Sequence, residues 1–281
     1  MVVLVTGANG QLGQALKAAA PAYSIMQFYF AGSVEADVTN PDSLNDIFSR
    51  VKPQYCINTA AYTAVDKAES EPEKAYAINV TGAANIALAC KNFGVVLLHI
   101  STDFVFDGTA HSPYNEDDTT NPQSVYGKTK RDGEIEIEKI TEQYYIVRTS
   151  WVYSQFGNNF MKTMLRLATE RSSLSVVNDQ VGTPTNANSL AHALIAIVAY
   201  NVANKDNPKF GIYNYSNEGQ CSWYDFAKKI FEVSKINIDL QPIATTDYPT
   251  PAKRPAYSVL DKEKIKEAFT IDIKLWNNTI S

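Results

Sequence analysis

Apolar and polar positions along the first half of the chain fall into blocks that predict strands and helices in turn. Residues 2–5 are uniformly apolar, as expected of a short strand that is buried on both faces of a sheet. Similar runs predict further strands, and the segments between them predict helices. The strands are expected at residues 24–30, 54–58, 95–100 and 144–147, and the helices at residues 14–20, 41–51, 71–93 and around Tyr126. Such alternation predicts an α/β fold, a Rossmann-like doubly wound parallel sheet with helices on both faces.

Local signals support two of these helices. Asn40 followed by Pro41 is typical of an N-cap and a first helical residue, and Gly94 is placed to end the helix that begins near residue 71.

The chain after residue 150 is less regular and predicts a smaller C-terminal lobe. Loops rich in Gly, Asn, Pro and Thr are expected at residues 151–160, 176–188, 213–220 and 247–254, and helices at 186–200 and 222–234. In the second helix Ser222 is the expected N-cap, with Asp225 at the third helical position. We therefore expect a dinucleotide-binding domain at residues 1–150. Residues 151–281 would form mainly a substrate-binding lobe, from which some segments can return to the first domain.

Composition excludes several classes of function. The chain has 281 residues, 45% of them hydrophobic, and a net charge of −5 without a basic run, which disfavours nucleic acid as a partner. No apolar stretch is long enough to span a membrane and no signal peptide is recognisable, so a cytoplasmic protein is expected. Cys56, Cys90 and Cys221 are expected to be reduced thiols, and the three histidines show no ligand spacing, so no metal site is predicted.

A glycine-rich turn follows the first strand and opens the first helix. Gly7 can make the tight turn, Gly10 lets the backbone approach a pyrophosphate, and Gly13 lets the helix pack closely on the strand. The spacing G-x-x-G-x-x-G is one residue wider than the common dinucleotide fingerprint, and a turn of purely structural use is the alternative. The strand–turn–helix context favours a dinucleotide site.

Tyr126 and Lys130 are four residues apart, so on a helix both side chains share one face. An ammonium group beside a phenol would lower the tyrosine pKa from about 10. The pair is common on solvated helices, but Thr102, just after the strand at 95–100, supplies a nearby hydroxyl. With the glycine turn this predicts a hydride-transfer site. Tyr126 would protonate a carbonyl oxygen that Thr102 orients, and Lys130 would lower the Tyr126 pKa and hold the nicotinamide ribose.

On these and further segments the chain resembles the extended short-chain dehydrogenase/reductase superfamily, and within it the dTDP-4-dehydrorhamnose reductases. The strings A-A-Y-T-A-V-D-K-A-E and S-T-D-x-V-F-D-G are specific to these reductases, whereas the glycine turn and Y-x-x-x-K mark only the superfamily. The resemblance covers essentially the whole chain. It rests on residues 5–13, 58–69, 78–80, 101–108, 126–130, 148–153, 179–185 and 254–261.

This resemblance implies reduction of the C4 ketone of dTDP-4-dehydro-L-rhamnose by NADPH or NADH, the last step in dTDP-L-rhamnose synthesis for cell-surface polysaccharide. It implies a catalytic trio of Thr102, Tyr126 and Lys130. The implied cofactor residues are Gly7, Gly10, Gln11, Leu12, Gly13, Asp37, Val38, Ala60, Ala61 and Tyr62, with Tyr126 and Lys130. The implied substrate residues are Thr63, Val65, Asp103, Phe104, Trp151, Gln180 and Arg254.

Structural explanations stay open for four of these residues. Asp37 could start the helix at residue 41, Asp103 could form a turn, Trp151 could be core, and Arg254 could pair with surface acids. Phe104 replaces a tyrosine that many members of the family have.

The chain also departs from the family in ways that affect assembly and cofactor choice. Some members bind magnesium at a dimer interface through carboxylates, but this chain has Gln14, Ala15, Asn186 and Asn188 in the corresponding segments. We therefore expect no metal and a monomer or weak homodimer. Residues 30–33 offer neither an acid for a ribose 2′-hydroxyl nor a cation for a 2′-phosphate, so use of both NADH and NADPH is expected.

Two other classes of function are consistent with the same fold. A nucleotide-sugar epimerase or dehydratase would share the scaffold, and a dehydratase would need an additional acid/base pair. A non-catalytic dinucleotide-binding regulatory subunit would have little need for the combination of Thr102, Tyr126 and Lys130.

Overall fold

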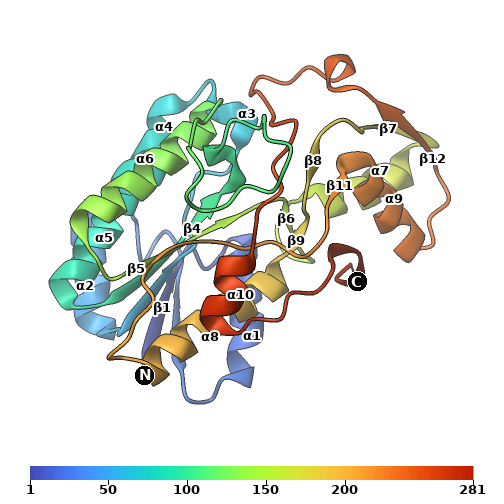
Figure 1. Cartoon of the computed structure of the whole chain (residues 1–281). Coiled ribbons are helices and arrows are strands. Elements are labelled where there is room, and N and C mark those ends of the chain that lie inside the picture. The colour runs from blue at the N-terminus through green and yellow to red at the C-terminus, as the bar shows by residue number, and fades with distance from the viewer. Residues whose placement is uncertain (281) are drawn as a thin grey trace.

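A parallel six-stranded sheet forms the centre of the larger part of the molecule, in a computed structural model that describes residues 1–280 (Figure 1). The strand order is β10-β5-β4-β3-β1-β2, and every neighbouring pair is parallel. The strands are β1 (Val2–Thr6), β2 (Gln27–Ala31), β3 (Tyr55–Asn58), β4 (Val96–Thr102), β5 (Tyr144–Thr149) and β10 (Gly211–Asn214). The predicted Rossmann-like fold is confirmed.

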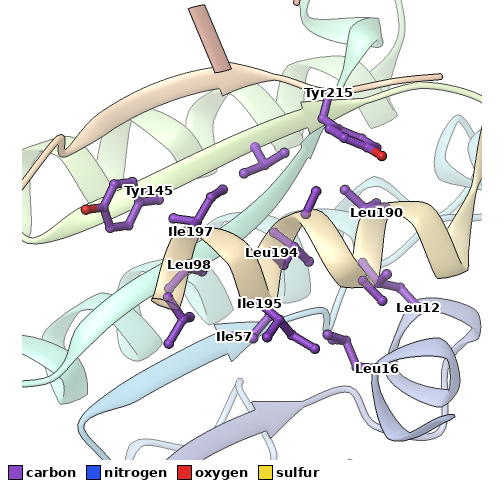
Figure 2. Packing of buried hydrophobic residues seen from close by; sticks show 14 of the residues in the cluster. Leu12, Leu16, Ile57, Leu98, Tyr145, Leu190, Leu194, Ile195, Ile197 and Tyr215 are labelled. Atoms are coloured by element: carbon purple, nitrogen blue, oxygen red, sulfur yellow. The ribbon is translucent and has the colours of Figure 1, made fainter. Parts of the chain in front are cut away.

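Helices cover both faces of the sheet, as predicted. One face carries α2 (Pro41–Val51), α5 (Gly82–Phe93) and α6 (Val125–Ile140), and the other carries α1 (Gln11–Ala19), α8 (Ala187–Ala203) and α10 (Glu263–Phe269) (Figure 1). Leu12 and Leu16 of α1 pack against Leu190, Leu194 and Ile195 of α8 under the strands (Figure 2). In residues 1–280 no helix is both long and apolar enough to cross a membrane.

Some predicted boundaries shift in the structure. The second strand begins at Gln27 rather than at residue 24, and the fourth continues to Thr102 rather than ending at residue 100. The predicted N-cap at Asn40 is confirmed, because its side chain accepts hydrogen bonds from the amides of Asp42 and Ser43.

The prediction of a single α-helix at residues 71–93 is wrong for the middle of this segment. The structure has α4 (Pro72–Tyr76), a π-helical segment (Ala77–Thr81) and then α5. As predicted, α5 ends at Gly94, which has a left-handed backbone (φ 65°). In the wider turn the Asn79 side chain accepts from the Tyr62 amide at 2.9 Å and donates to the Thr129 hydroxyl at 3.1 Å. Such π turns often occur at functional sites.

The smaller lobe is built from short elements of the second half of the chain. Its helices are α7 (Phe160–Glu170) and α9 (Trp223–Val233). Its strands are β6 (Val152–Tyr153), β7 (Ser173–Val177), β8 (Val181–Gly182), β9 (Thr185–Asn186), β11 (Cys221–Ser222) and β12 (Asp239–Ile243). The expectation of a continuous loop at 176–188 is wrong, because backbone pairing with β12, β11 and β6 orders parts of it. The predicted cap of α9 by Ser222 with Asp225 is confirmed.

Short helical turns complete the described chain. They are α3 (Val65–Ala68) and the 3-10 turns η1 (Ala20–Ala22), η3 (Asp103–Val105), η4 (Thr245–Asp247) and η5 (Trp276–Asn278).

A buried ion pair fixes α6 to the sheet. Two Arg148 nitrogens on β5 donate to both carboxylate oxygens of Glu134 on α6, at 2.9 and 2.8 Å. A third donates to the Glu116 carbonyl, and the Glu116 carboxylate accepts from the Asn214 amide of β10. Because Arg148 and Glu134 are almost fully buried, neither charge has water as an alternative partner.

We expect Glu134→Gln to destabilise the protein strongly. The substitution leaves the buried Arg148 guanidinium without its carboxylate, a change that typically costs about 3–5 kcal/mol. Urea denaturation followed by circular dichroism would measure it. Glu138→Gln, on the exposed side of the same helix, is the matched control and should change little. Equal, small effects of both substitutions would contradict the central role of the pair.

Candidate active site

Polar residues converge where the parallel strands end, at the carboxyl edge of the sheet. β1 leads into Gly7, β3 into Ala60, β4 into Asp103 and β5 into Trp151. This is the edge at which ligands bind in open α/β sheets. The structure therefore brings these four segments together at one edge of the sheet.

The glycine turn forms a close-packed cradle between β1 and α1. Gly7 has φ 67°, and a Cβ on it would lie 2.5 Å from the Ala60 nitrogen. A Cβ on Gly13 would lie 2.6 Å from the Ala8 Cα, while Gly10 is exposed and precedes α1. No side chain caps the start of α1, so its first amides remain available to an anion.

Thr102 ends β4 beside Tyr126, which lies in the first turn of α6. Ser124 caps this helix by accepting a hydrogen bond from the Gly127 amide at 3.1 Å. The cap fixes the start of the helix and thus the position of Tyr126 in its first turn. Burial raises the pKa of Tyr126 to about 12; the Thr102 hydroxyl opposes the rise and the Asp103 charge adds to it. In this structure the net shift of the Tyr126 pKa is upward and Lys130 is not among its causes, so an effect of Lys130 on the Tyr126 pKa stays a prediction.

Lys130 has its hydrogen-bond partners on β4. Its Nζ lies 2.6 Å from the Ile100 carbonyl oxygen and 3.2 Å from His99 Nε2. The side chain is only 2% exposed, and this burial lowers the Lys130 pKa to about 8, against the attraction of the Glu134 charge. Tyr126 and Lys130 are thus both on α6, and the hydrogen bonds of Lys130 Nζ go to β4.

Asp103 is a buried acid next to these groups. Burial raises its pKa to about 6, although the hydroxyls of Ser258 and Thr102 and nearby backbone amides favour the carboxylate. Asp103 Oδ1 accepts from the Thr102 hydroxyl at 3.0 Å, while Oδ2 makes no hydrogen bond of normal geometry among the described residues. An acid with a perturbed pKa and a free oxygen at a strand end is typical of functional sites.

A cleft of about 820 Å³ opens between the sheet edge and the smaller lobe. Four predicted substrate residues line it, namely Phe104, Trp151, Gln180 and Arg254. Trp151 has a left-handed backbone (φ 46°), and its ring stacks on Trp223 at a centroid distance of 3.5 Å. Arg254 donates to Asp66 at 2.6 Å, so the surface ion pair considered from the sequence exists, but within the cleft wall.

Other predicted residues are held by the fold itself. The Leu12 side chain is part of the core beneath the sheet, and the Val38 side chain is buried against α5. The Gln11 side chain bonds to Val152, Ser154 and Asn159 of the smaller lobe. For Gln11 and Leu12 only backbone groups are therefore free to face a ligand.

The remaining predicted positions differ in their surroundings. Asp37 accepts from the Thr39 amide and hydroxyl in a turn, as in the structural alternative for this residue. The Tyr62 hydroxyl donates to Glu71 at 2.8 Å. Ala60 and Ala61 lie half-buried next to the glycine turn, whereas Thr63 and Val65 are outside the residues that line the cleft.

Several cleft residues were not predicted from the sequence. They are Asp66, Phe160, Arg171, Trp223 and Tyr248, together with apolar residues of α7 and β7. Asp66 lies within the specific string at residues 60–69, which could have indicated it. Trp223, Arg171 and Tyr248 lie in no motif, so only the tertiary structure reveals them.

Comparisons with known proteins agree with this geometry. The family model described as the RmlD substrate binding domain matches residues 1–281. A dTDP-4-dehydrorhamnose reductase from Aggregatibacter actinomycetemcomitans is 43% identical, over 99% of this chain and 96% of its own.

Solved structures are similar over their full length. The crystal structure of a dTDP-4-dehydrorhamnose reductase from Clostridium acetobutylicum matches this chain with a TM-score of 0.91 at 42% identity, over 99% of this chain and 96% of its own. The crystal structure of the Bacillus anthracis reductase, solved in complex with NADP, matches with a TM-score of 0.92 at 37% identity and the same coverage. The chain therefore belongs to the dTDP-4-dehydrorhamnose reductases, the family described by the RmlD substrate binding domain.

Proposed function

We propose that this protein reduces the C4 ketone of dTDP-4-dehydro-L-rhamnose to dTDP-L-rhamnose, with NADPH or NADH as the reductant and Tyr126 as the proton donor. The observation that carries the proposal is the position of the Tyr126 phenol beside Thr102 at the end of β4, packed against Phe104, which lines the large cleft. Family membership supports the substrate class.

The glycine cradle fits a dinucleotide. Gly7 and Gly13 allow the turn and the helix to pack without a Cβ, and the uncapped start of α1 offers amides to a pyrophosphate. The reduced nicotinamide supplies a hydride when the cofactor is bound. The chain itself binds and orients the reactants and delivers the proton.

Tyr126 is suited to donate a proton. Because burial raises its pKa to about 12, the phenol stays protonated near pH 7 and begins the reaction as an acid. The Thr102 hydroxyl lies beside it and can hydrogen-bond the same carbonyl oxygen. As negative charge develops on that oxygen during hydride transfer, two hydroxyl donors in a buried site stabilise it.

The cleft suits a nucleotide sugar. Arg254 and Arg171 line it, and a guanidinium group binds a diphosphate in bidentate fashion. A diphosphate would compete with Asp66 for Arg254. The stacked Trp151 and Trp223 rings give an apolar wall that excludes water from one side of the reacting sugar.

Tyr126→Phe tests the proton donor. We expect turnover to fall at least about 100-fold, since a general acid typically contributes that much, while cofactor binding is retained. The assay follows reduced-cofactor absorbance with enzymatically generated dTDP-4-dehydro-L-rhamnose. The control is Tyr55→Phe on β3, which removes a buried hydroxyl bonded to Asn201 of α8. This variant should remain active. Full activity of Tyr126→Phe would contradict the assignment.

Cofactor choice gives a second test. No acid or cation at residues 30–33 distinguishes the ribose 2′-hydroxyl from a 2′-phosphate, so similar kcat/KM values are expected for NADH and NADPH. Steady-state kinetics with each reductant would measure the ratio. A preference of about 100-fold or more for either would refute dual use and point to a discriminating group elsewhere.

Asp103 links the site to stability. Because its folded-state pKa is raised to about 6, the folded protein holds a proton that the unfolded chain has already lost above about pH 4. The stability contribution is therefore complete below pH 4 and is lost as the pH rises through 6, a loss of up to about 3 kcal/mol.

Asp103→Asn should remove this pH dependence. We expect the variant to be more stable than the original protein at pH 8, with the difference shrinking toward pH 4. Urea midpoints measured at both pH values would show it. A difference that is the same at both pH values would mean that ionisation of Asp103 is not the cause.

A further inference from the structure

The side chain of Gln11 joins the glycine cradle to the smaller lobe, and the reaction outlined above gives this contact no role. Gln11 is the first residue of α1, directly after Gly10. Its Nε2 donates to the Val152 carbonyl at 3.1 Å, and its Oε1 accepts from Asn159 Nδ2 at 2.7 Å and from the Ser154 hydroxyl at 3.1 Å. One residue at the sheet edge thus contacts three points of the smaller lobe.

These partners fix the orientation of the Gln11 amide. The Val152 carbonyl can only accept, so the Gln11 NH₂ group must face it and the Gln11 oxygen must face Asn159. Asn159 is fixed as well, because its Oδ1 accepts from the Lys162 amide and caps α7, which turns its NH₂ group toward Gln11. Neither amide can flip without bringing two acceptors or two donors together, so the contact has a single geometry.

Gln11 thereby holds the segments that carry two walls of the cleft. Val152 follows Trp151 in the chain, and Asn159 directly precedes α7. Trp151 lines the cleft, as do three residues of α7, namely Phe160, Met164 and Leu167. A displacement of the glycine turn would be passed to both walls, because Gln11 bonds to a residue beside each of them.

The loop at residues 155–158 lies over the start of α1. Gln155, Gly157 and Asn158 are exposed, and a Cβ on Gly157 would lie 3.4 Å from Gln11 Cβ. Exposed segments with few buried contacts open locally at low free-energy cost. The order of this loop, and of the α7 start that follows it, should therefore depend on how firmly Gln11 is held.

The backbone of Gln11 belongs to the cofactor side. Its amide is among the first of α1, which a helix leaves without intrahelical partners and which are available to a pyrophosphate. A bound dinucleotide would hold Gln11 by its main chain, while the smaller lobe holds the same residue by its side chain.

We propose that Gln11 is a positioning residue that couples cofactor binding to the substrate cleft. A dinucleotide on the glycine turn fixes residues 152–160 through the Gln11 side chain, and so sets Trp151 and α7 for the second ligand. This coupling rests on the proposed function only in taking that ligand to be a nucleotide sugar. By linkage, each ligand raises the affinity for the other by the same factor.

Hydrogen exchange of the protein with NADP⁺ alone tests the first step. We expect NADP⁺ to slow exchange of the amides at the start of α7, residues 160–165, by about fivefold or more. In Gln11→Met, which keeps a side chain of similar length without its hydrogen bonds, this slowing should be lost while protection of residues 7–13 remains.

Gln14→Met is the matched control for this experiment. Gln14 lies on the same helix, and its side chain donates to the Asn9 carbonyl rather than to the smaller lobe, so the slowing at α7 should persist. Equal slowing in Gln11→Met and the original protein, or none in either, would overturn the proposal.

Asn159→Asp tests the same contact from the smaller lobe, and decides the matter if Gln11→Met is unstable. The carboxylate still caps α7 but presents an acceptor to Gln11 Oε1 in place of a donor. We expect the slowing at α7 to be lost as in Gln11→Met, with no further loss in the double variant. Additive losses would mean that the two residues act separately, against the proposal.

Calorimetry with dTDP measures the effect on the cleft. In the original protein NADP⁺ should raise the affinity for dTDP by about fivefold or more, and dTDP should raise the affinity for NADP⁺ equally. In Gln11→Met the factor should approach one although NADP⁺ still binds, and an unchanged factor would contradict the coupling. If dTDP does not bind the original protein at all, the proposed function fails instead, while the exchange experiment still decides the role of Gln11.

Discussion

The buried contact between Arg148 and Glu134 is the constraint on which the site depends. Glu134 lies one turn after Lys130 and two turns after Tyr126, so anchoring its carboxylate on β5 sets the rotation of the whole α6 face. Gly133 allows α6 to lie against the Asn79 carbonyl, where a Cβ would clash. The position of the phenol at the sheet edge therefore depends on an ion pair two turns further along its helix, in the interior of the protein.

Burial also determines the chemical state of the site. It raises the pKa values of Tyr126 and Asp103 and lowers those of Lys130 and His99, so each group is displaced toward its neutral form. A weakly charged, poorly hydrated interior strengthens the effect of the few dipoles and hydroxyls that face the substrate. Burial of these polar groups lowers the stability of the fold, because Asp103, Asn58 and His99 would be better solvated in the unfolded state.

Sequence reasoning succeeded where structure is local and failed where it depends on distant contacts. Local signals predicted the strands, the glycine turn, the helix caps at Asn40 and Ser222, and the end of a helix at Gly94, because each is set by neighbouring residues. The raised pKa of Tyr126 was not predicted, because it depends on burial, and the contacts of Lys130 Nζ depend on β4. Likewise, Glu134 and Arg148 belong to no motif as a pair, and the use of the Gln11 side chain by the smaller lobe appears only in the tertiary structure.

The late position of α8 and β10 in the chain has a consequence for biogenesis. α8 covers part of one face of the sheet and β10 pairs with the edge of β5, yet both follow α7 and the strands β6 to β9 of the smaller lobe in sequence. While a ribosome synthesises the first 186 residues, only α1 covers that face and β5 is an open, apolar edge. Such surfaces invite mispairing between nascent chains, so the newly made protein should rely on chaperones until α8 and β10 emerge.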